Sequence, residues 1–148
     1  MKIVVDANAL FSYFKKEAKA RELIIDPTRK HRLEFVSPEF VLEEINKHKD
    51  TICSRFDIHS KDFDIMFSSL SLFVKTVKKE DFEAEIPTAR KILPEHVKDV
   101  PYIALTLFFK KKRDKVALWS NEVRLKVLEE HEIEVYTTQE LLEKVGLI

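Results

Sequence analysis

The sequence is poor in cysteine, in glycine and in net charge. The lone cysteine, Cys53, excludes an internal disulfide and a cysteine-rich zinc site. The 26 basic and 26 acidic side chains cancel, so no global electrostatic field draws the protein toward nucleic acid or a membrane. A nucleic-acid partner would therefore need a local basic patch or bound metal ions. The single glycine, Gly146, combined with so many charged residues, weakly resembles the composition of thermophilic proteins.

Long apolar runs are missing as well. No window approaches about 18 consecutive apolar residues, so we expect no membrane-spanning helix. Lys2 leads into an apolar run of only three residues, Ile3 to Val5, which does not fit a signal peptide. We therefore expect a cytoplasmic protein with no membrane partner. Its 148 residues predict one domain, residues 1–148, that buries about 70% of the surface of the unfolded chain.

Short apolar runs alternate with helical patterns along the chain. Strands are expected at residues 3–5, 33–36, 72–77, 116–120 and 133–136. The first of these is apolar on both faces, which is typical of a central strand in a parallel sheet. Helical patterns are expected at residues 9–24, within 50–72 with a break near 58–60, and at 78–93 with an interruption at Pro87. Further helices are expected to begin at residues 39, 99 and 138 and directly after residue 122. The alternation predicts an α/β fold with a mainly parallel sheet sandwiched between helices.

Two helical regions need a closer description. Ser37, Pro38 and Glu39 are expected to open a helix as N-cap, first-turn proline and first-turn acid, with Phe40 on its buried face. Phenylalanines gather between residues 56 and 73, at positions 56, 63, 67 and 73. They have two interpretations, contacts in a homodimer or filling of the core. We expect Asp26 and Pro27 to end the first helix.

Four acidic residues stand where a strand ends or a helix begins, and these are Asp6, Glu44, Asp99 and Glu122. In open α/β sheets, ligands bind just beyond the carboxyl ends of the strands. Carboxylates gathered there would repel each other unless a cation neutralised them, and Mg²⁺ or Mn²⁺ suits an all-oxygen set of ligands. A structural interpretation stands beside this one, in which Asp6 and Asp99 only cap helices, Glu122 only complements a helix dipole and Glu44 is only solvated.

The four acids lie in segments that resemble, in order and near the usual spacing, the four motifs of PIN domains. The segments are Val5-Asp6-Ala7-Asn8-Ala9-Leu10, Val41-Leu42-Glu43-Glu44-Ile45, Asp99-Val100-Pro101-Tyr102-Ile103-Ala104-Leu105 and Trp119-Ser120-Asn121-Glu122. The resemblance covers about residues 2–136. It implies a three-layer α/β/α sandwich around a parallel sheet of about five strands.

The resemblance also implies which residues form the site. Asp6, Glu44 and Asp99 match the first three acids of the family. Glu44 is preferred over Glu43 because the acid of that motif directly precedes the small aliphatic residue and because Glu44 flanks the expected buried face. Ser120 and Asn121 match the polar residues of the fourth motif, and Asn8 matches the polar residue two positions after the first acid. The chain departs from the family at Glu122, where aspartate is usual, which puts a second metal ion in question.

The function implied by the resemblance is metal-dependent hydrolysis of RNA. Asp6 and Asp99 would be direct ligands of Mg²⁺ or Mn²⁺, Glu44 would bind metal or orient water, and Glu122 would complete the site. Arg124 is a candidate contact for a phosphate of single-stranded RNA, or a partner for an acid. Many family members are toxins of the VapC type, so an antitoxin protein is a candidate partner.

Other interpretations remain open. A PIN fold with weak or no catalysis could serve as an RNA- or protein-binding module. A phosphoryl-transfer enzyme with Asp6 as nucleophile is disfavoured, because such folds place a second aspartate where Asn8 stands. The basic run 110–113 is expected to be a solvated helix end, with RNA contact as the alternative. The five histidines, at positions 31, 48, 59, 96 and 131, show no metal-ligand spacing and are expected at the surface or its boundary.

Overall fold

The computed structural model describes residues 1–26 and 32–148. Pro27, which we expected to help end the first helix, and His31 lie outside the described residues. No helix in the described part of the chain is long and apolar enough to cross a membrane.

Five parallel strands form one sheet with the order β3-β2-β1-β4-β5. The strands are β1 (Lys2–Val5), β2 (Glu34–Pro38), β3 (Val74–Val77), β4 (Val116–Trp119) and β5 (Val135–Tyr136). β1 is central, with β2 on one side and β4 on the other, and its last three residues are completely buried. Chain order runs outward from β1 in both directions, so the carboxyl ends of β1 and β4 flank a topological switch point, where ligands bind in open α/β sheets.

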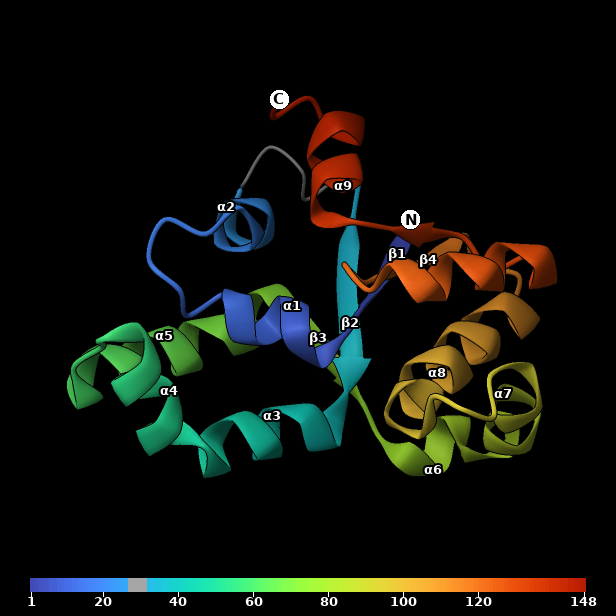
Figure 1. Cartoon of the computed structure of the whole chain (residues 1–148), viewed down its shortest axis with the longest axis horizontal. Coiled ribbons are helices and arrows are strands. Elements are labelled where there is room, and N and C mark those ends of the chain that lie inside the picture. Colours follow the sequence, from blue (N-terminus) through green and yellow to red (C-terminus); the bar gives the residue numbers. More distant parts are fainter. Residues whose placement is uncertain (27–31) are drawn as a thin grey trace.

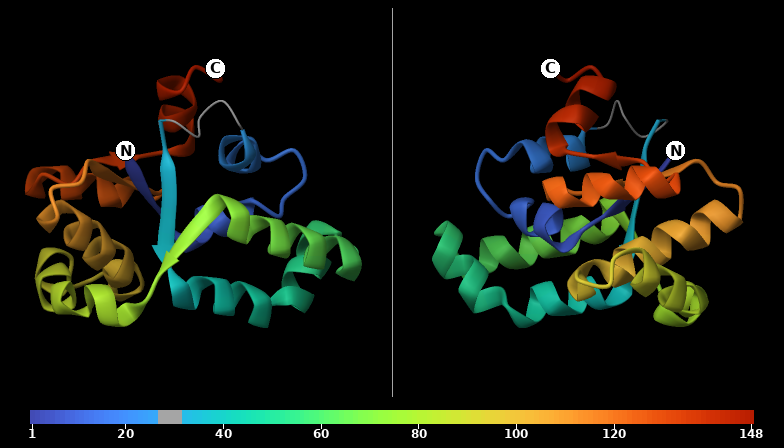
Figure 2. Two further views of the ribbon diagram at one scale, coloured as in Figure 1. Left: turned by 180° about the vertical axis from the view of Figure 1, so that it is seen from behind. Right: turned by 45° about the vertical axis from the view of Figure 1, so that its right-hand side comes forward.

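Helices cover both faces of the sheet, which confirms the predicted three-layer α/β/α sandwich (Figure 1). The helices are α1 (Ala7–Ser12), α2 (Lys19–Ile25), α3 (Glu39–Lys47), α4 (Lys49–Phe56), α5 (Ser60–Phe73), α6 (Lys79–Phe82), α7 (Ile86–Ile92), α8 (Val100–Lys111) and α9 (Thr138–Lys144), with 3₁₀ segments between some of them, the longest being Val123–His131. Figure 2 shows α3, α4 and α5 on one side of β2, and α6, α7 and α8 on the other.

The helix expected at 9–24 is two helices in the structure. Helix α1 ends at Ser12 and α2 begins at Lys19, and between them Glu17 adopts a positive φ of 59°. A non-glycine residue in that conformation interrupts a right-handed helix, which periodicity of apolar residues does not reveal.

Ser37 does not cap a helix, contrary to prediction. β2 continues through Pro38, and the buried Ser37 hydroxyl donates a 3.0 Å hydrogen bond to the carbonyl of Val5 on the neighbouring strand. Pro38 is the N-cap of α3 and makes no side-chain cap bond. The Ser-Pro-Glu pattern predicted the start of the helix correctly. The predicted hydrogen-bond partner of the serine was wrong, because its acceptor on the neighbouring strand is distant in sequence.

Other boundaries moved by a few residues. Helix α5 continues to Phe73, so β3 begins at Val74, and β5 is shorter than predicted at its start. The predicted interruption at Pro87 comes earlier, as a 3₁₀ turn over Glu83–Glu85, and Pro87 lies in the first turn of α7.

Aromatic side chains fill the core on the α5 face of the sheet. Phe63 is completely buried, and its ring stacks on Phe14 at 4.9 Å and on Phe67 at 5.9 Å between centroids. Phe56 and Phe73 are partly buried against the same core. The core-filling interpretation of these phenylalanines therefore accounts for their positions. Trp119 of β4 is also completely buried, as expected.

Candidate functional site

Asp6 lies directly after β1, at the carboxyl edge of the sheet. Its backbone N–H donates to the carbonyl of Trp119 on β4, and its Oδ1 accepts a 2.9 Å hydrogen bond from the N–H of Ala9. Asp6 is thus the N-cap of α1 and only 5% exposed. The cap fixes the carboxylate at the end of the strand, so capping and a role in a site are compatible.

Asp99 stands at the N-cap position of α8, but its side chain makes no cap hydrogen bond. The side chain of His96 lies beside it, with 3.7 Å between Nδ1 and Oδ2. The interpretation of Asp99 as a helix cap therefore finds no supporting bond. Its carboxylate instead lines a cavity that it shares with Asp6.

This cavity, termed the acidic cavity below, has a volume of about 500 Å³ and lies at the switch point of the sheet. It brings together five of the predicted residues, which are Asp6, Asn8, Asp99, Glu122 and Arg124. They come from α1, the start of α8 and the segment after β4, three separate parts of the sequence. Convergence at the carboxyl edge of a parallel sheet is the arrangement that the strand pattern predicted.

Burial and like charge act together on the two aspartates. Burial raises the pKa of Asp6, and the charge of Asp99 raises it further, whereas hydrogen bonds from Ser120 and Ala9 lower it. Burial also raises the pKa of Asp99, opposed by His96 and reinforced by the charge of Glu122. Carboxylates held together in a partly desolvated cavity are characteristic of functional sites.

Glu122 is held by Arg124. The guanidinium Nε lies 2.9 Å from Oε1 and Nη2 lies 3.3 Å from Oε2, so the contact is bidentate. The Arg124 side chain lowers the pKa of Glu122. Glu122 also caps the 3₁₀ helix Val123–His131 by accepting from the N–H of Arg124. Of the two expectations for Arg124, the structure shows the pairing with an acid.

The structure does not bring Glu44 into the acidic cavity. Glu44 lies on α3, and its Oε2 is 3.4 Å from Nε2 of His48, one turn further along the helix. Its charge is still close enough to contribute to the raised pKa of the Tyr102 hydroxyl. Glu43, the alternative, lines a different cavity. Phe40 is 37% exposed and is not part of the buried face of α3, which Val41 and Ile45 form.

The three polar residues expected to support the site occupy different places. Asn8 is exposed and lines the acidic cavity. Ser120 is buried, hydrogen-bonds to Asp6 and accepts a 3.1 Å bond from the N–H of Glu122. Asn121 instead makes two hydrogen bonds to Thr138, which tie the end of β4 to the start of α9. Asn121 does not line the cavity.

Tyr102 and His96 also line the cavity, and neither was identified from the sequence as a member of the site. Tyr102 is buried, and burial together with the charges of Asp6 and Asp99 raises the pKa of its hydroxyl. His96 was expected at the surface or its boundary, and it is half-buried beside Asp99. Each lies three residues from Asp99, and on α8 that spacing places Tyr102 and Asp99 on the same face, which is the signal that could have found it.

The residues present fit a hard divalent cation. Within residues 1–26 and 32–148, no group of three or more histidine, cysteine or acidic side chains is arranged to hold a metal ion. Asp6 and Asp99 nevertheless supply two carboxylates, and Asn8 and Ser120 add neutral oxygens beside them. Mg²⁺ keeps several waters and is usually bound by one or two carboxylates, so this set of oxygen ligands suits it.

The basic run 110–113 lies at the opposite end of α8 from Asp99. Lys111 pairs with the buried Glu85, and Lys110 donates a hydrogen bond to the carbonyl of Glu132. These contacts agree with a structural role for the helix end.

A sequence model of the PIN domain matches residues 4–141, which is most of the chain and includes all four motifs. No curated protein compared with the chain gives a match.

Proposed function

Since the chain belongs to the PIN-domain family and has a nuclease-type fold, we propose that it is a metal-dependent endoribonuclease that hydrolyses phosphodiester bonds of RNA. The observation that carries this proposal is the pairing of Asp6 and Asp99 in the acidic cavity. They come from distant parts of the chain, and burial together with the charge of Asp99 raises the pKa of Asp6. A folded protein tolerates such repulsion where a bound cation relieves it.

Asp6 and Asp99 would hold Mg²⁺ or Mn²⁺. When bound, the cation would lower the pKa of a water molecule and offset charge on the phosphate. Ser120 and the N–H of Ala9 orient the Asp6 carboxylate through hydrogen bonds. Asn8, exposed at the cavity wall, offers an amide that can donate to a phosphate oxygen.

Arg124 supplies a cation at the rim of the acidic cavity. Its side chain is 70% exposed, and its guanidinium group binds Glu122 in this structure. The same geometry matches two oxygens of a phosphate. An RNA phosphate entering the cavity would therefore compete with Glu122 for Arg124, and Glu122 would be released beside the two aspartates.

The test is cleavage of a labelled single-stranded RNA by purified protein with Mg²⁺ or Mn²⁺. We expect cleavage with either ion, and none with EDTA. Persistent cleavage in EDTA would contradict the metal mechanism.

A second function, an RNA-binding module without catalysis, is favoured by one observation. Glu44 pairs with His48 and Glu122 pairs with Arg124, so two of the four acids face basic side chains rather than Asp6 and Asp99. Binding of RNA without cleavage under either metal would support this alternative.

A further inference from the structure

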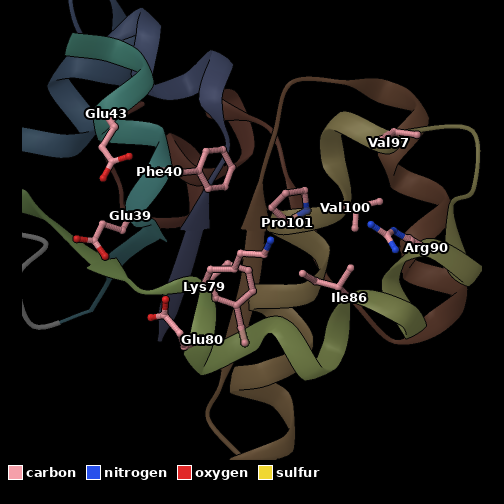
Figure 3. A pocket seen from close by; sticks show the side chains of 11 residues that line it. Glu39, Phe40, Glu43, Lys79, Glu80, Ile86, Arg90, Val97, Val100 and Pro101 are labelled. Atoms are coloured by element: carbon pink, nitrogen blue, oxygen red, sulfur yellow. The ribbon is translucent and has the colours of Figure 1, made fainter. Parts of the chain in front are cut away.

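A second cavity, shown in Figure 3, shares a lining residue with the acidic cavity. It has a volume of about 450 Å³, within the range of about 300–1,000 Å³ common for ligand sites. Its walls come from α3, which follows β2, and from α6, α7 and the start of α8. The two cavities share Val97, which is 72% exposed. A chain bound in one can therefore continue into the other.

An open aromatic ring marks the boundary between the two cavities. Phe40 of α3 points into the second cavity, toward Pro101 at the start of α8 (Figure 3). Its ring centroid is 6.4 Å from that of Tyr102, which lines the acidic cavity. Phe82, Ile86 and Val100 complete an apolar lining. An exposed phenylalanine over such a lining offers a planar ligand a face on which to stack.

Two cations line this cavity, Lys79 of α6 and Arg90 of α7. Within residues 1–26 and 32–148, neither of these side chains forms an ion pair or a hydrogen bond. Figure 3 shows the Lys79 amino group directed toward the space between Phe40 and Pro101. On the α3 side, Glu39 and Glu43 add carboxylates that can accept hydrogen bonds.

We propose that this second cavity binds one unpaired nucleobase of the RNA strand whose phosphate occupies the acidic cavity. The proposal rests on the proposed function and adds a subsite for the nucleotide beside the cleaved bond. The base would stack on Phe40, as unpaired bases stack on aromatic side chains in other RNA-binding sites. Lys79 and Arg90 would contact the flanking phosphate or the carbonyl oxygens of the base, and the glutamates would accept from its N–H groups.

This subsite predicts a requirement for single-stranded substrate. A base in a duplex is stacked and paired, and it would have to leave the helix to reach Phe40. The chain as a whole carries no net charge to attract RNA, so a stacking site with local cations would supply affinity that global electrostatics does not.

A binding cycle tests the subsite. The affinity of short single-stranded RNAs is measured in EDTA, where no cleavage is expected, for the wild type and for Phe40→Leu. The RNAs carry one abasic residue, moved stepwise along the strand. At one position we expect the abasic residue to weaken wild-type binding about 5- to 100-fold. Phe40→Leu should weaken binding of the intact RNA by a similar factor, and the two losses should not add.

Matched variants separate stacking from general effects. Phe40→Tyr keeps the ring and should bind like the wild type. Arg90→Gln and Lys91→Gln each remove one charge from α7, but only Arg90 lines the cavity, so we expect the larger loss of affinity for Arg90→Gln. Thermal unfolding shows whether Phe40→Leu is folded, and Arg90→Gln tests the same cavity independently.

The outcomes distinguish this proposal from the proposed function. If the wild type cleaves RNA and the Phe40→Leu and abasic losses are absent or fully additive, the subsite is wrong and the nuclease stands. If the losses are present and non-additive but no RNA is cut with Mg²⁺ or Mn²⁺, the subsite stands and the nuclease is wrong. If all variants bind RNA like the wild type, the cavity serves another occupant, such as a protein segment, and the proposal is overturned.

Discussion

The Arg124 guanidinium holds both carboxylate oxygens of Glu122, with 2.9 Å between Nε and Oε1 and 3.3 Å between Nη2 and Oε2. Glu122 is the acid at which the chain departs from its family, where aspartate is usual. The longer glutamate side chain brings its carboxylate to the arginine two residues further along the chain, so the fourth acid is paired with the cation that we propose binds a phosphate.

Variants of this pair should have opposite effects on substrate affinity. Arg124→Gln removes the proposed phosphate contact, so we expect KM to rise about 5- to 50-fold, as for loss of a charge-assisted hydrogen bond. Glu122→Gln frees Arg124 from its partner, so we expect KM to stay level or fall while kcat falls. Steady-state kinetics on one RNA measures both, and equal changes in KM for the two variants would contradict a phosphate role for Arg124.

Loss of either aspartate should abolish cleavage. Asp6→Asn and Asp99→Asn each remove a carboxylate proposed to hold the metal ion, so we expect kcat/KM to fall at least about 100-fold. The control is Asp50→Asn, the same change on the exposed face of α4, which should cleave like the wild type. A variant at Asp6 or Asp99 with wild-type activity would place the reaction elsewhere.

Divalent metal should stabilise the protein through the same carboxylates. Ligand at about 100 times its Kd adds about 2.7 kcal/mol, which corresponds to an increase in Tm of about 5–10 °C for a domain of this size. We expect this increase for the wild type with Mg²⁺ or Mn²⁺ and a much smaller one for Asp99→Asn. Thermal unfolding with and without EDTA measures it, and isothermal titration calorimetry gives the stoichiometry. An equal shift in both proteins would mean that the ion binds away from Asp99.

Stability without metal should depend on pH in a direction set by Asp6. Burial and then Asp99 raise the pKa of this carboxyl in the folded protein, whereas in the unfolded chain it is about 3.9. The group therefore favours folding below the unfolded value, and this contribution is lost as pH rises through the folded value.

The corresponding comparison uses Asp6→Asn, which stays neutral and retains an oxygen to accept from the N–H of Ala9. In EDTA we expect the Tm of this variant to exceed that of the wild type near about pH 7, and the difference to shrink toward about pH 4. The variant Asp50→Asn is measured in the same way, as a control for the replacement of a carboxylate by an amide. If the wild type is instead more stable than Asp6→Asn at neutral pH, the stabilising interactions of the Asp6 carboxylate outweigh the free-energy cost of burying its charge.

The sequence by itself determined the layers of the fold and the positions where carboxylates meet. Apolar runs and helical periodicity depend on neighbouring residues, so they identified the five strands and the sandwich correctly. The run Ile3 to Val5 is fully buried, and a residue directly after a central parallel strand must stand at the edge of the sheet, which fixed the place of Asp6. Asp99 at the start of α8 follows from the same local reasoning.

Only the tertiary structure decided what each side chain contacts. Asn121 bonds to Thr138, seventeen positions away, and Ser37 bonds to Val5, thirty-two positions away. Such pairs have no periodicity in the sequence. The contact between Phe40, which lines the second cavity, and Tyr102, which lines the acidic cavity, likewise depends on how α3 packs beside α8. Local patterns set where the backbone goes, whereas the direction of a side chain and the partner of a charge depend on elements that only folding brings together.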